Sequence, residues 1–275
     1  YADLFRPSGN GKSPALLVRT PYNKSSPSVR GLTLDALRAA GNGYAVVIQD
    51  VRGRYSSDGE FYPFVNEIED GYDSVEWVAG QSWCDGKVGM FGNSYMGATQ
   101  WLAAKAKPPS LLAIAPGITA SDYHEGWTWQ GGAFSLGFNL SWTLGGLVTA
   151  NWDHLAARLY LSPRQFDILI DQKDALTASF KHLPLRELPD FESDLAPYYY
   201  DWLDHPEYDD YWKRISIEES HSAITVPSFN YGGWYDIFLS GTLRNFPRMR
   251  VQGATAEARQ GQRLVIGPWV HGGSP

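Results

Sequence analysis

The chain of 275 residues is long enough to bury a sizeable hydrophobic core in one or two domains. Its residues are 43% hydrophobic and 19% charged, a balance that is typical of globular proteins and excludes disordered and collagen-like classes. The net charge of −7 argues against binding to nucleic acid, which requires a basic surface. No apolar run is long enough for a membrane-spanning helix, and no signal peptide is recognisable, so we expect a soluble protein with no membrane partner.

Strand and helix patterns alternate through the first 117 residues. Continuous apolar runs predict buried strands at residues 15–20, 44–49, 87–91 and 111–115. Helical periodicity lies between them, over residues 32–40 and 68–79, and the second helix is expected to begin with a capping box formed by Asn66 and Glu69. This alternation predicts an α/β fold, with a mainly parallel sheet and helices on both faces.

The alternation stops between residues 121 and 224, where helical patterns occur at 133–150, 155–161 and 164–180 without a convincing buried strand. Six of the 11 tryptophans lie in this segment: Trp127, Trp129, Trp142, Trp152, Trp202 and Trp212. We therefore predict a helical cap over the site, inserted into a discontinuous core of residues 1–120 and 225–275. The alternative is a helical satellite that packs on one side of the core.

Residues 83–101 (WCDGKVGMFGNSYMGATQW) carry the strongest catalytic pattern. A buried strand leads into a turn that ends at Ser94, and a helix follows. This is the arrangement of a nucleophile elbow, in which a tight turn exposes a serine hydroxyl above the sheet and directs the next backbone N–H at developing negative charge. Gly-x-Ser also occurs by chance, and here Met96 delays the next glycine to Gly97. The pattern alone leaves both interpretations open.

A serine attacks a carbonyl at neutral pH only with the help of a base, and that base needs an orienting partner. In parallel sheets such groups lie at the carboxyl ends of strands. Two later strands, predicted at residues 224–231 and 263–266 with a helix between them, lead to Asp236 and His271. The chain order of Ser94, Asp236 and His271 is that of α/β-hydrolases.

Other titratable residues have simpler explanations. Asp50 also follows a strand, but Arg52 and Arg54 beside it favour an ion pair that braces the loops. Three carboxylates on the helix of residues 68–79 are expected to face solvent: Asp70, Asp73 and Glu76. The remaining histidines lie in or near the predicted cap, where exposure or a structural hydrogen bond is expected: His124, His154, His182, His205 and His221.

No cluster of His, Cys, Asp or Glu has metal-ligand spacing, and the phosphate-binding glycine patterns are absent from the sequence. Cys84 is the single cysteine, which permits no internal disulfide, and the neighbouring Trp83 favours burial of its thiol. We therefore expect no metal and no cofactor.

Five segments resemble the signature blocks of a known family: RTPYNK, VIQDVRGRYSSDGEF, WCDGKVGMFGNSYMGATQW, GGWYD and GPWVHG. The family is the X-prolyl dipeptidyl-peptidase family of serine hydrolases, and the resemblance is greatest to its bacterial cocaine-esterase branch. The family elbow, Gly-x-Ser-Tyr-x-Gly, matches the segment around Ser94 with its delayed glycine. The resemblance implies an α/β-hydrolase fold and a catalytic triad of Ser94, Asp236 and His271.

The resemblance also implies an oxyanion hole made by the hydroxyl of Tyr22 and the backbone N–H of Tyr95. In the cocaine-esterase branch, residues that match Trp127, Trp142 and Phe238 form the wall of the acyl pocket. Family members have an extra strand pair before the matching region and a jelly-roll β-domain after it. This chain is therefore expected to be the catalytic core of a longer bacterial protein. The cytoplasm is its expected compartment, with export left open because the sequence does not begin with Met.

The sequence thus predicts a serine hydrolase that cleaves carboxylic esters through an acyl-enzyme intermediate. Its tryptophans favour a hydrophobic or aromatic acyl group. The alternative within the family is an X-Pro peptide or α-amino ester, whose ammonium group would need an anionic partner such as Asp122 or Glu125. A catalytically inactive binding domain on a hydrolase fold is the alternative from another class. The expected partner is a small-molecule ester or amide, and formation of a homo-oligomer is left open.

Overall fold

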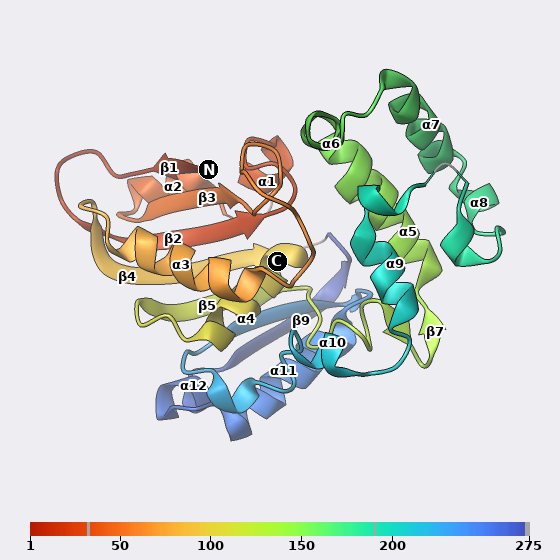
Figure 1. Ribbon diagram of the computed structural model, residues 1–275. Helices are drawn as coiled ribbons and strands as arrows, with labels where there is room; N and C mark the ends of the chain where they lie inside the picture. Colours follow the sequence, from red (N-terminus) through yellow and green to blue (C-terminus); the bar gives the residue numbers. More distant parts are fainter. Residues whose placement is uncertain (32–33, 190, 273–275) are drawn as a thin grey trace.

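The computed structural model describes residues 1–31, 34–189 and 191–272 (Figure 1). Within these residues, a seven-stranded sheet has the order β1-β3-β2-β4-β5-β8-β9; β1 is antiparallel to β3, and the other neighbours are parallel. This confirms the predicted α/β fold. The strands are β1 (Ala2–Phe5), β2 (Ser13–Thr20), β3 (Ala45–Asp50), β4 (Cys84–Asn93), β5 (Leu111–Gly117), β8 (Phe229–Tyr235) and β9 (Arg263–Val270).

Helices cover both faces of the sheet because successive residues of a strand point to opposite faces. Leu17 of β2 lies in one buried cluster with Trp101 of α4, whereas Val18 packs in a second cluster with Ala39 of α2. The helices of this part are α1 (Pro27–Gly31), α2 (Ala36–Gly41), α3 (Glu67–Ala79), α4 (Tyr95–Ala106), α11 (Leu239–Gln252) and α12 (Ala256–Gln260).

The register of the parallel strands places their carboxyl ends at one edge. Thr20 at the end of β2 pairs with Asp50 at the end of β3, and Asn93 of β4 pairs with Gly117 of β5. β8 and β9 run beside each other to their ends. The residues that follow these strands therefore meet at the same edge of the sheet, where ligands bind in open α/β sheets.

The segment between β5 and β8 consists mainly of short helices, with one small sheet of two strands, β6 (Trp129–Gln130) and β7 (Ala133–Phe134). Helices α5 to α9 gather beyond the ends to which the arrows of β2 and β4 point (Figure 1). That this segment acts as a cap remains a prediction. Its helices are α5 (Leu136–Ser141), a π-helix (Trp142–Val148), α6 (Trp152–Leu159), α7 (Pro163–Asp174), α8 (Leu176–Ser179), α9 (Pro197–Asp204) and α10 (Asp210–Lys213), with 3-10 turns at Thr149–Asn151, Leu185–Glu187, Ser193–Leu195 and His221–Ala223.

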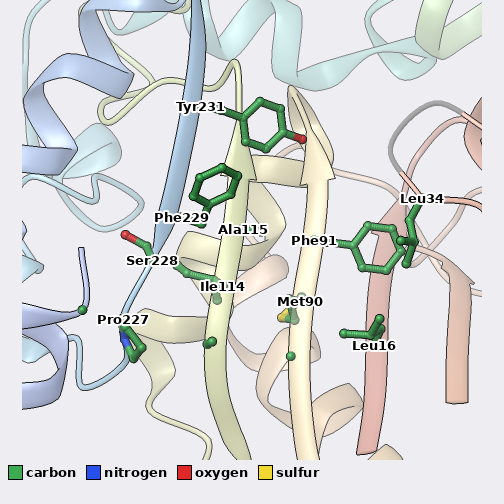
Figure 2. A pocket seen from close by; sticks show the side chains of 13 residues that line it. Leu16, Leu34, Met90, Phe91, Ile114, Ala115, Pro227, Ser228, Phe229 and Tyr231 are labelled. Atoms are coloured by element: carbon green, nitrogen blue, oxygen red, sulfur yellow. The ribbon is translucent and has the colours of Figure 1, made fainter. Parts of the chain in front are cut away.

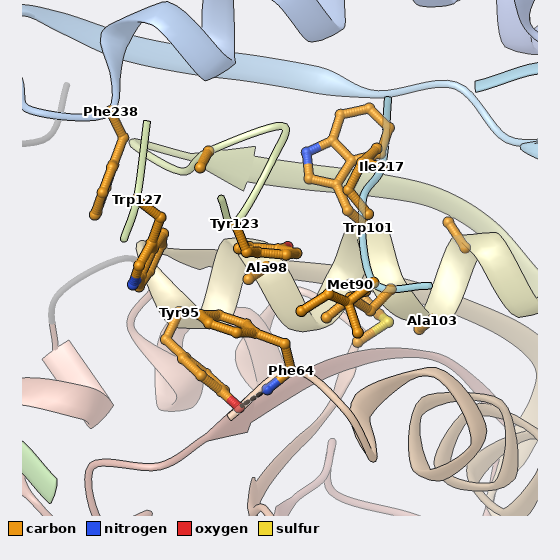
Figure 3. Packing of buried hydrophobic residues seen from close by; sticks show 14 of the residues in the cluster. Phe64, Met90, Tyr95, Ala98, Trp101, Ala103, Tyr123, Trp127, Ile217 and Phe238 are labelled. Atoms are coloured by element: carbon orange, nitrogen blue, oxygen red, sulfur yellow. Dashed lines mark hydrogen bonds between the residues drawn. The ribbon is translucent and has the colours of Figure 1, made fainter. Parts of the chain in front are cut away.

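Stacked aromatic rings support the helix that follows Ser94 (Figure 3). The ring centroids of Phe64 and Tyr123 are 4.0 Å apart, and those of Phe64 and Tyr95 are 5.1 Å apart. Trp101 of α4 is fully buried in the same cluster. Burying such rings stabilises a fold by roughly 25 cal/mol per Å² of apolar surface. The residues after the elbow therefore rest on a rigid core.

An apolar hollow of about 530 Å³ lies against the sheet, on the side of α2 (Figure 2). Its lining includes Leu16 of β2, Phe91 of β4 and Phe229 of β8, which point into it from neighbouring parts of the sheet. Among the described residues, no Asp, Glu, Lys, Arg or His lines the hollow, and none of the three predicted triad residues does. The candidate active site lies elsewhere, at the carboxyl edge.

Three local predictions are wrong. Asn66 has helical dihedral angles and its side chain caps no N–H, because such a bond requires an extended N-cap residue. β8 begins at Phe229, five residues later than predicted, because Ile224 and Val226 are buried without joining the ladder. Leu37, assigned to an apolar helical stripe, is 72% exposed. In addition, β1 was not predicted, since an edge strand of four residues is too short to show periodicity.

Candidate active site

Ser94 occupies the turn between β4 and α4. Its φ of 57° and ψ of −122° are unusual for a residue other than glycine, and they match the strained conformation of a nucleophile elbow. Glycines permit the close packing on either side. A Cβ atom on Gly92 would lie 2.6 Å from Cβ of Met96, and one on Gly97 would lie 2.9 Å from the side chain of Thr119. The delayed glycine thus lets α4 approach the chain that follows β5.

Two hydrogen bonds join the three predicted triad residues. Ser94 Oγ lies 3.0 Å from Nε2 of His271, and Nδ1 of His271 lies 2.7 Å from Oδ2 of Asp236. A neutral imidazole with its proton on Nδ1 donates to the carboxylate and accepts from the serine hydroxyl, which is the arrangement that general-base catalysis needs. β4, β8 and β9 bring these distant residues together because they end at one edge of the sheet.

Asp236 is held from both sides. Its Oδ2 bonds His271, and its Oδ1 accepts the backbone N–H of Phe238 at 2.7 Å. The Asp236 side chain is 0% exposed, whereas the His271 side chain is 29% exposed. The carboxylate is therefore fixed and shielded from water, and the imidazole keeps an open side for a substrate.

The residues proposed for the oxyanion hole lie next to Ser94. Tyr95 is the first residue of α4, so its backbone N–H has no acceptor within the helix. Tyr22 lies in the loop after β2 and lines the same cavity as Ser94. The indole N–H of Trp142 donates to that hydroxyl at 3.1 Å. Burial raises the pKa of Tyr22 to about 12, so the hydroxyl keeps its proton at neutral pH and can donate it in a hydrogen bond.

A buried network anchors the side chain of Tyr95. Its hydroxyl accepts the N–H of Phe64 at 2.9 Å, the dashed line in Figure 3, and donates to Oε1 of Glu67 at 3.0 Å. The other oxygen of Glu67 accepts from Arg19 at 2.5 Å. Burial raises the pKa of the Glu67 carboxyl, while the charge of Arg19 opposes the rise. The sequence did not reveal this network, because a glutamate at the start of a helix is normally exposed and its partners lie on other elements.

Trp127, Trp142 and Phe238 lie together beside the triad. The rings of Trp127 and Phe238 stack with centroids 4.1 Å apart and planes 8° apart. The rings of Phe238 and His271 are nearly perpendicular, with centroids 5.0 Å apart, and the ring centroids of Trp142 and Trp127 are 5.4 Å apart. All three side chains are buried. They form a closed aromatic wall.

A cavity of about 360 Å³ opens at Ser94, and the three wall residues are not among those that line it. Its surface is mostly apolar, and no described carboxylate lines it. The lining residues are Tyr22, Ser28, Val29, Asn93, Ser94, Met96, Ile118, His271 and Gly272. The space next to the serine therefore suits an uncharged group.

The ion pair predicted for Asp50 is not formed among the described residues. Asp50 instead accepts the backbone N–H of Lys24 at 2.7 Å and that of Ser56 at 3.4 Å. Burial raises the pKa of its carboxyl. Arg52 pairs with a different carboxylate, and Arg54 donates to backbone carbonyls. Asp50 does brace the loops, but through backbone donors.

Two carboxylates that were expected to face solvent have partners. Asp70 forms an ion pair with Arg52, whose Nε lies 2.9 Å from Oδ2. Glu76 accepts the backbone N–H and the hydroxyl of Ser110 at 2.9 and 3.0 Å. Asp73 is exposed, as predicted. Both carboxylates join α3 to neighbouring loops. The helical pattern in the sequence could not reveal these bonds, because the partners lie outside the helix.

Asp122, a candidate partner for a substrate ammonium, is 5% exposed and already bonded. It accepts from the backbone N–H groups of His124 and Glu125 and from the hydroxyl of Ser216. Burial raises the pKa of its carboxyl. Glu125 accepts the N–H of Gly131. Neither carboxylate lines the cavity at Ser94.

The remaining histidines play no visible part at Ser94. His124 bonds the carbonyl of Pro206, and His221 bonds the side chain of Asn245, which agrees with the structural roles predicted for them. Cys84 is buried, as predicted. The described residues contain no group of three or more His, Cys, Asp or Glu that could hold a metal ion. Across the same part of the chain, every helix is too short or too polar to cross a membrane.

The fold and the arrangement at Ser94 are those of an α/β-hydrolase. The family model described as X-Pro dipeptidyl-peptidase (S15 family) matches residues 1–273, and the chain belongs to that family. The family resemblance seen in the sequence motifs is thereby confirmed.

Cocaine esterase from Rhodococcus sp. (strain MB1 Bresler) is 39% identical over 275 residues, which cover 98% of this chain and 46% of that protein. This chain thus spans less than half the length of the esterase. A CocE/NonD family hydrolase from Staphylococcus aureus has the same fold, with a TM-score of 0.71, 24% identity and coverage of 99% of this chain and 44% of that one. An α-amino acid ester hydrolase aligns with a TM-score of 0.65, 23% identity and coverage of 98% and 45%.

Proposed function

We propose that this protein is a serine hydrolase that cleaves carboxylic esters through an acyl-enzyme intermediate. The proposal rests above all on the hydrogen-bonded series of Ser94, His271 and Asp236 at the carboxyl edge of the sheet. The strained backbone of Ser94 and the 39% identity to cocaine esterase support it.

In the proposed mechanism, Ser94 Oγ attacks the ester carbonyl while Nε2 of His271 takes its proton. The carbonyl oxygen becomes an oxyanion, which accepts hydrogen bonds from the N–H of Tyr95 and the hydroxyl of Tyr22. His271 then returns the proton to the leaving alcohol as the C–O bond breaks. A water molecule, deprotonated by the same imidazole, then attacks the acyl-enzyme, and the imidazole returns that proton to Ser94 Oγ as the acid is released. Asp236 orients the imidazole and stabilises its charged form throughout.

We propose an uncharged ester with a hydrophobic or aromatic acyl group as the substrate. The aromatic wall of Trp127, Trp142 and Phe238 and the apolar cavity at Ser94 support this choice. An α-amino ester or X-Pro peptide is the second candidate, because the family description names X-Pro dipeptidyl-peptidase. The internal hydrogen bonds of Asp122 argue against it, since that carboxylate has no oxygen left without a partner.

A fluorophosphonate probe and a matched set of esters test the proposal. We expect stoichiometric labelling of the wild-type protein and none of Ser94→Ala, with an unchanged melting temperature because the hydroxyl supports no core packing. Benzoyl, acetyl and α-aminoacyl esters of one chromogenic phenol should give the highest kcat/KM for the benzoyl ester. Labelling of Ser94→Ala would disprove the assignment of the nucleophile, and a preference for the α-aminoacyl ester would favour the second candidate.

A further inference from the structure

Arg54 is a buried cation with no acidic partner among the described residues. It lies in the loop after β3 and is 1% exposed, and the ion pairs of this part of the chain do not include it. Burial lowers the pKa of its guanidinium, yet arginine starts so high that the group stays charged at neutral pH. An unpaired buried charge is costly. In a chain that folds with such a charge, the hydrogen bonds or the electrostatic field of the charged group therefore offset the cost.

The guanidinium of Arg54 donates three hydrogen bonds to backbone carbonyls. Nε donates to the carbonyl of Pro21 at 2.8 Å, Nη2 donates to that of Gly146 at 3.0 Å, and Nη1 donates to that of Leu147. Pro21 directly precedes Tyr22. Gly146 and Leu147 belong to the π-helix that begins at Trp142. One guanidinium thus connects the loop after β2 to the π-helix.

These two segments carry the two members of one hydrogen bond at the candidate oxyanion hole. The indole of Trp142 donates to the hydroxyl of Tyr22 at 3.1 Å, and Tyr22 lines the same cavity as Ser94. The geometry of the bond depends on the distance between the two backbone segments. Arg54 sets that distance because its planar fork is rigid and bonds both segments at once.

The positive charge of Arg54 also favours the proposed oxyanion hole. A cation close to a tyrosine hydroxyl favours negative charge on that oxygen and on any acceptor bonded to it. In a site shielded from water such a charge acts more strongly than it would in solvent. The positive field of Arg54 therefore stabilises an oxyanion that accepts from Tyr22 more than it stabilises a neutral ester.

We propose that Arg54 is a positioning residue of the oxyanion hole, which holds Tyr22 and Trp142 at bonding distance and directs positive potential at the developing oxyanion. This inference rests on the proposed esterase function. A guanidinium that only pins the π-helix to the core would affect stability but would act independently of the Tyr22 hydroxyl.

A double-mutant cycle with Tyr22→Phe separates these two roles. We expect Arg54→Met to lower kcat for an acetyl ester about 10²-fold with KM within about threefold, as for loss of an oxyanion donor. In the Tyr22→Phe background the same change should lower kcat less than about threefold, because the group through which Arg54 acts is gone. Arg54→Lys keeps the charge, but its single ammonium nitrogen cannot reproduce the planar fork that bonds both segments, so we expect a fall of about tenfold, again confined to the protein that retains Tyr22.

Arg52→Met is the matched control, because Arg52 is a half-exposed arginine in the same loop that pairs with Asp70. It should leave kcat unchanged. If Arg54→Met fails to fold, the kinetics of Arg54→Lys in the two backgrounds distinguish the positioning role from a purely structural one. Equal losses in the wild-type and Tyr22→Phe backgrounds, or variants of Arg54 with wild-type kcat, would overturn the inference while leaving the esterase proposal intact. Absence of ester hydrolysis by the wild-type protein would overturn both.

Discussion

The backbone of Ser94 has the strained geometry that the proposed nucleophile requires. A left-handed φ at a residue with a side chain is costly, and the turn keeps it because glycines on both sides allow β4 and α4 to pack closely. The same turn leaves the N–H of Tyr95 without a helical acceptor. The strained backbone of Ser94 and the N–H of Tyr95 that lacks a helical acceptor therefore arise from the same turn.

Tyr22→Phe tests the second oxyanion donor, because it keeps the ring and removes only the hydroxyl. We expect kcat to fall by roughly 10²–10³, about 3–4 kcal/mol, with KM and the melting temperature little changed. Tyr62→Phe is the control, since the hydroxyl of Tyr62 bonds Asp201 and Tyr211 away from Ser94. A kcat within threefold of wild type would assign Tyr22 to packing alone.

Asp236→Asn tests the acid of the triad. We expect kcat to fall on the order of 10⁴-fold, since an amide favours the wrong tautomer of His271. Asp50→Asn is the comparison, because that carboxylate also follows a strand but accepts only backbone N–H groups. Steady-state kinetics of both variants would refute the assignment if the change at Asp50 were the more damaging.

Short elements between β5 and β8 supply the walls of the site. The π-helix contains Trp142 at its start, and the indole ring packs so closely on Gly146 that a Cβ there would lie 2.9 Å from Cδ1. π-Helical turns often occur at functional sites. Here the wider turn presents an indole to Tyr22 while its later carbonyls bond Arg54. One irregular helix thereby contributes to both the aromatic wall and the proposed oxyanion hole.

Trp127→Leu tests the aromatic wall, because Trp127 bonds none of the triad residues and stacks on Phe238. We expect kcat/KM for a benzoyl ester to fall about tenfold more than for an acetyl ester, because Trp127 supports Phe238, whose ring packs on His271, and the larger acyl group depends more on that wall. Trp212→Leu removes a buried tryptophan that packs on His124 instead, and should leave this ratio unchanged. Equal effects on both esters would make Trp127 a structural residue.

At the scale of the molecule, residues of both the sheet and the segment between β5 and β8 surround the candidate site. Polar bridges such as those of Tyr62 to Asp201 and Asn151 to Gly53 join them. His221 provides another link, from the chain before β8 to Asn245 on α11. Its Nδ1 has no partner among the described residues, so a second proton there would be buried without an acceptor.

The pH dependence of stability follows from His221. Burial lowers the pKa of its imidazole below the ordinary value of 6.5, and the nearby charge of Arg248 adds to this effect. On acidification through pH 6.5 the unfolded chain therefore takes up a proton that the folded chain does not. The contribution to stability is complete above pH 6.5 and is lost below it.

Melting temperatures between about pH 7.5 and 5.5 test this prediction. The wild-type protein should lose more stability over this range than His221→Gln, which keeps a donor for Asn245 and does not titrate. The difference between the two isolates His221 from all other groups. Parallel curves would show that this histidine does not set the pH dependence.

The sequence by itself determined the alternation of strands and helices, the elbow at Ser94 and the positions of Asp236 and His271 after strands. These features depend on local periodicity and on the rule that parallel strands end at one edge of the sheet. Each of them can therefore be predicted from a short segment of the chain. The predicted start of β8 was wrong, because Ile224 and Val226 are buried by tertiary packing and not by strand pairing.

Only the tertiary structure decided which charged residues meet. Arg52 pairs with Asp70 and not with Asp50, Glu67 bonds Tyr95 across the core, and Arg54 has backbone carbonyls as its partners. Hydrogen bonds and ion pairs act over about 3 Å, and residues far apart in sequence reach that distance only after the elements have packed. Burial of a hydrophobic segment can be predicted from that segment because it requires no particular partner. A hydrogen bond or an ion pair depends on the partner that the fold brings within reach.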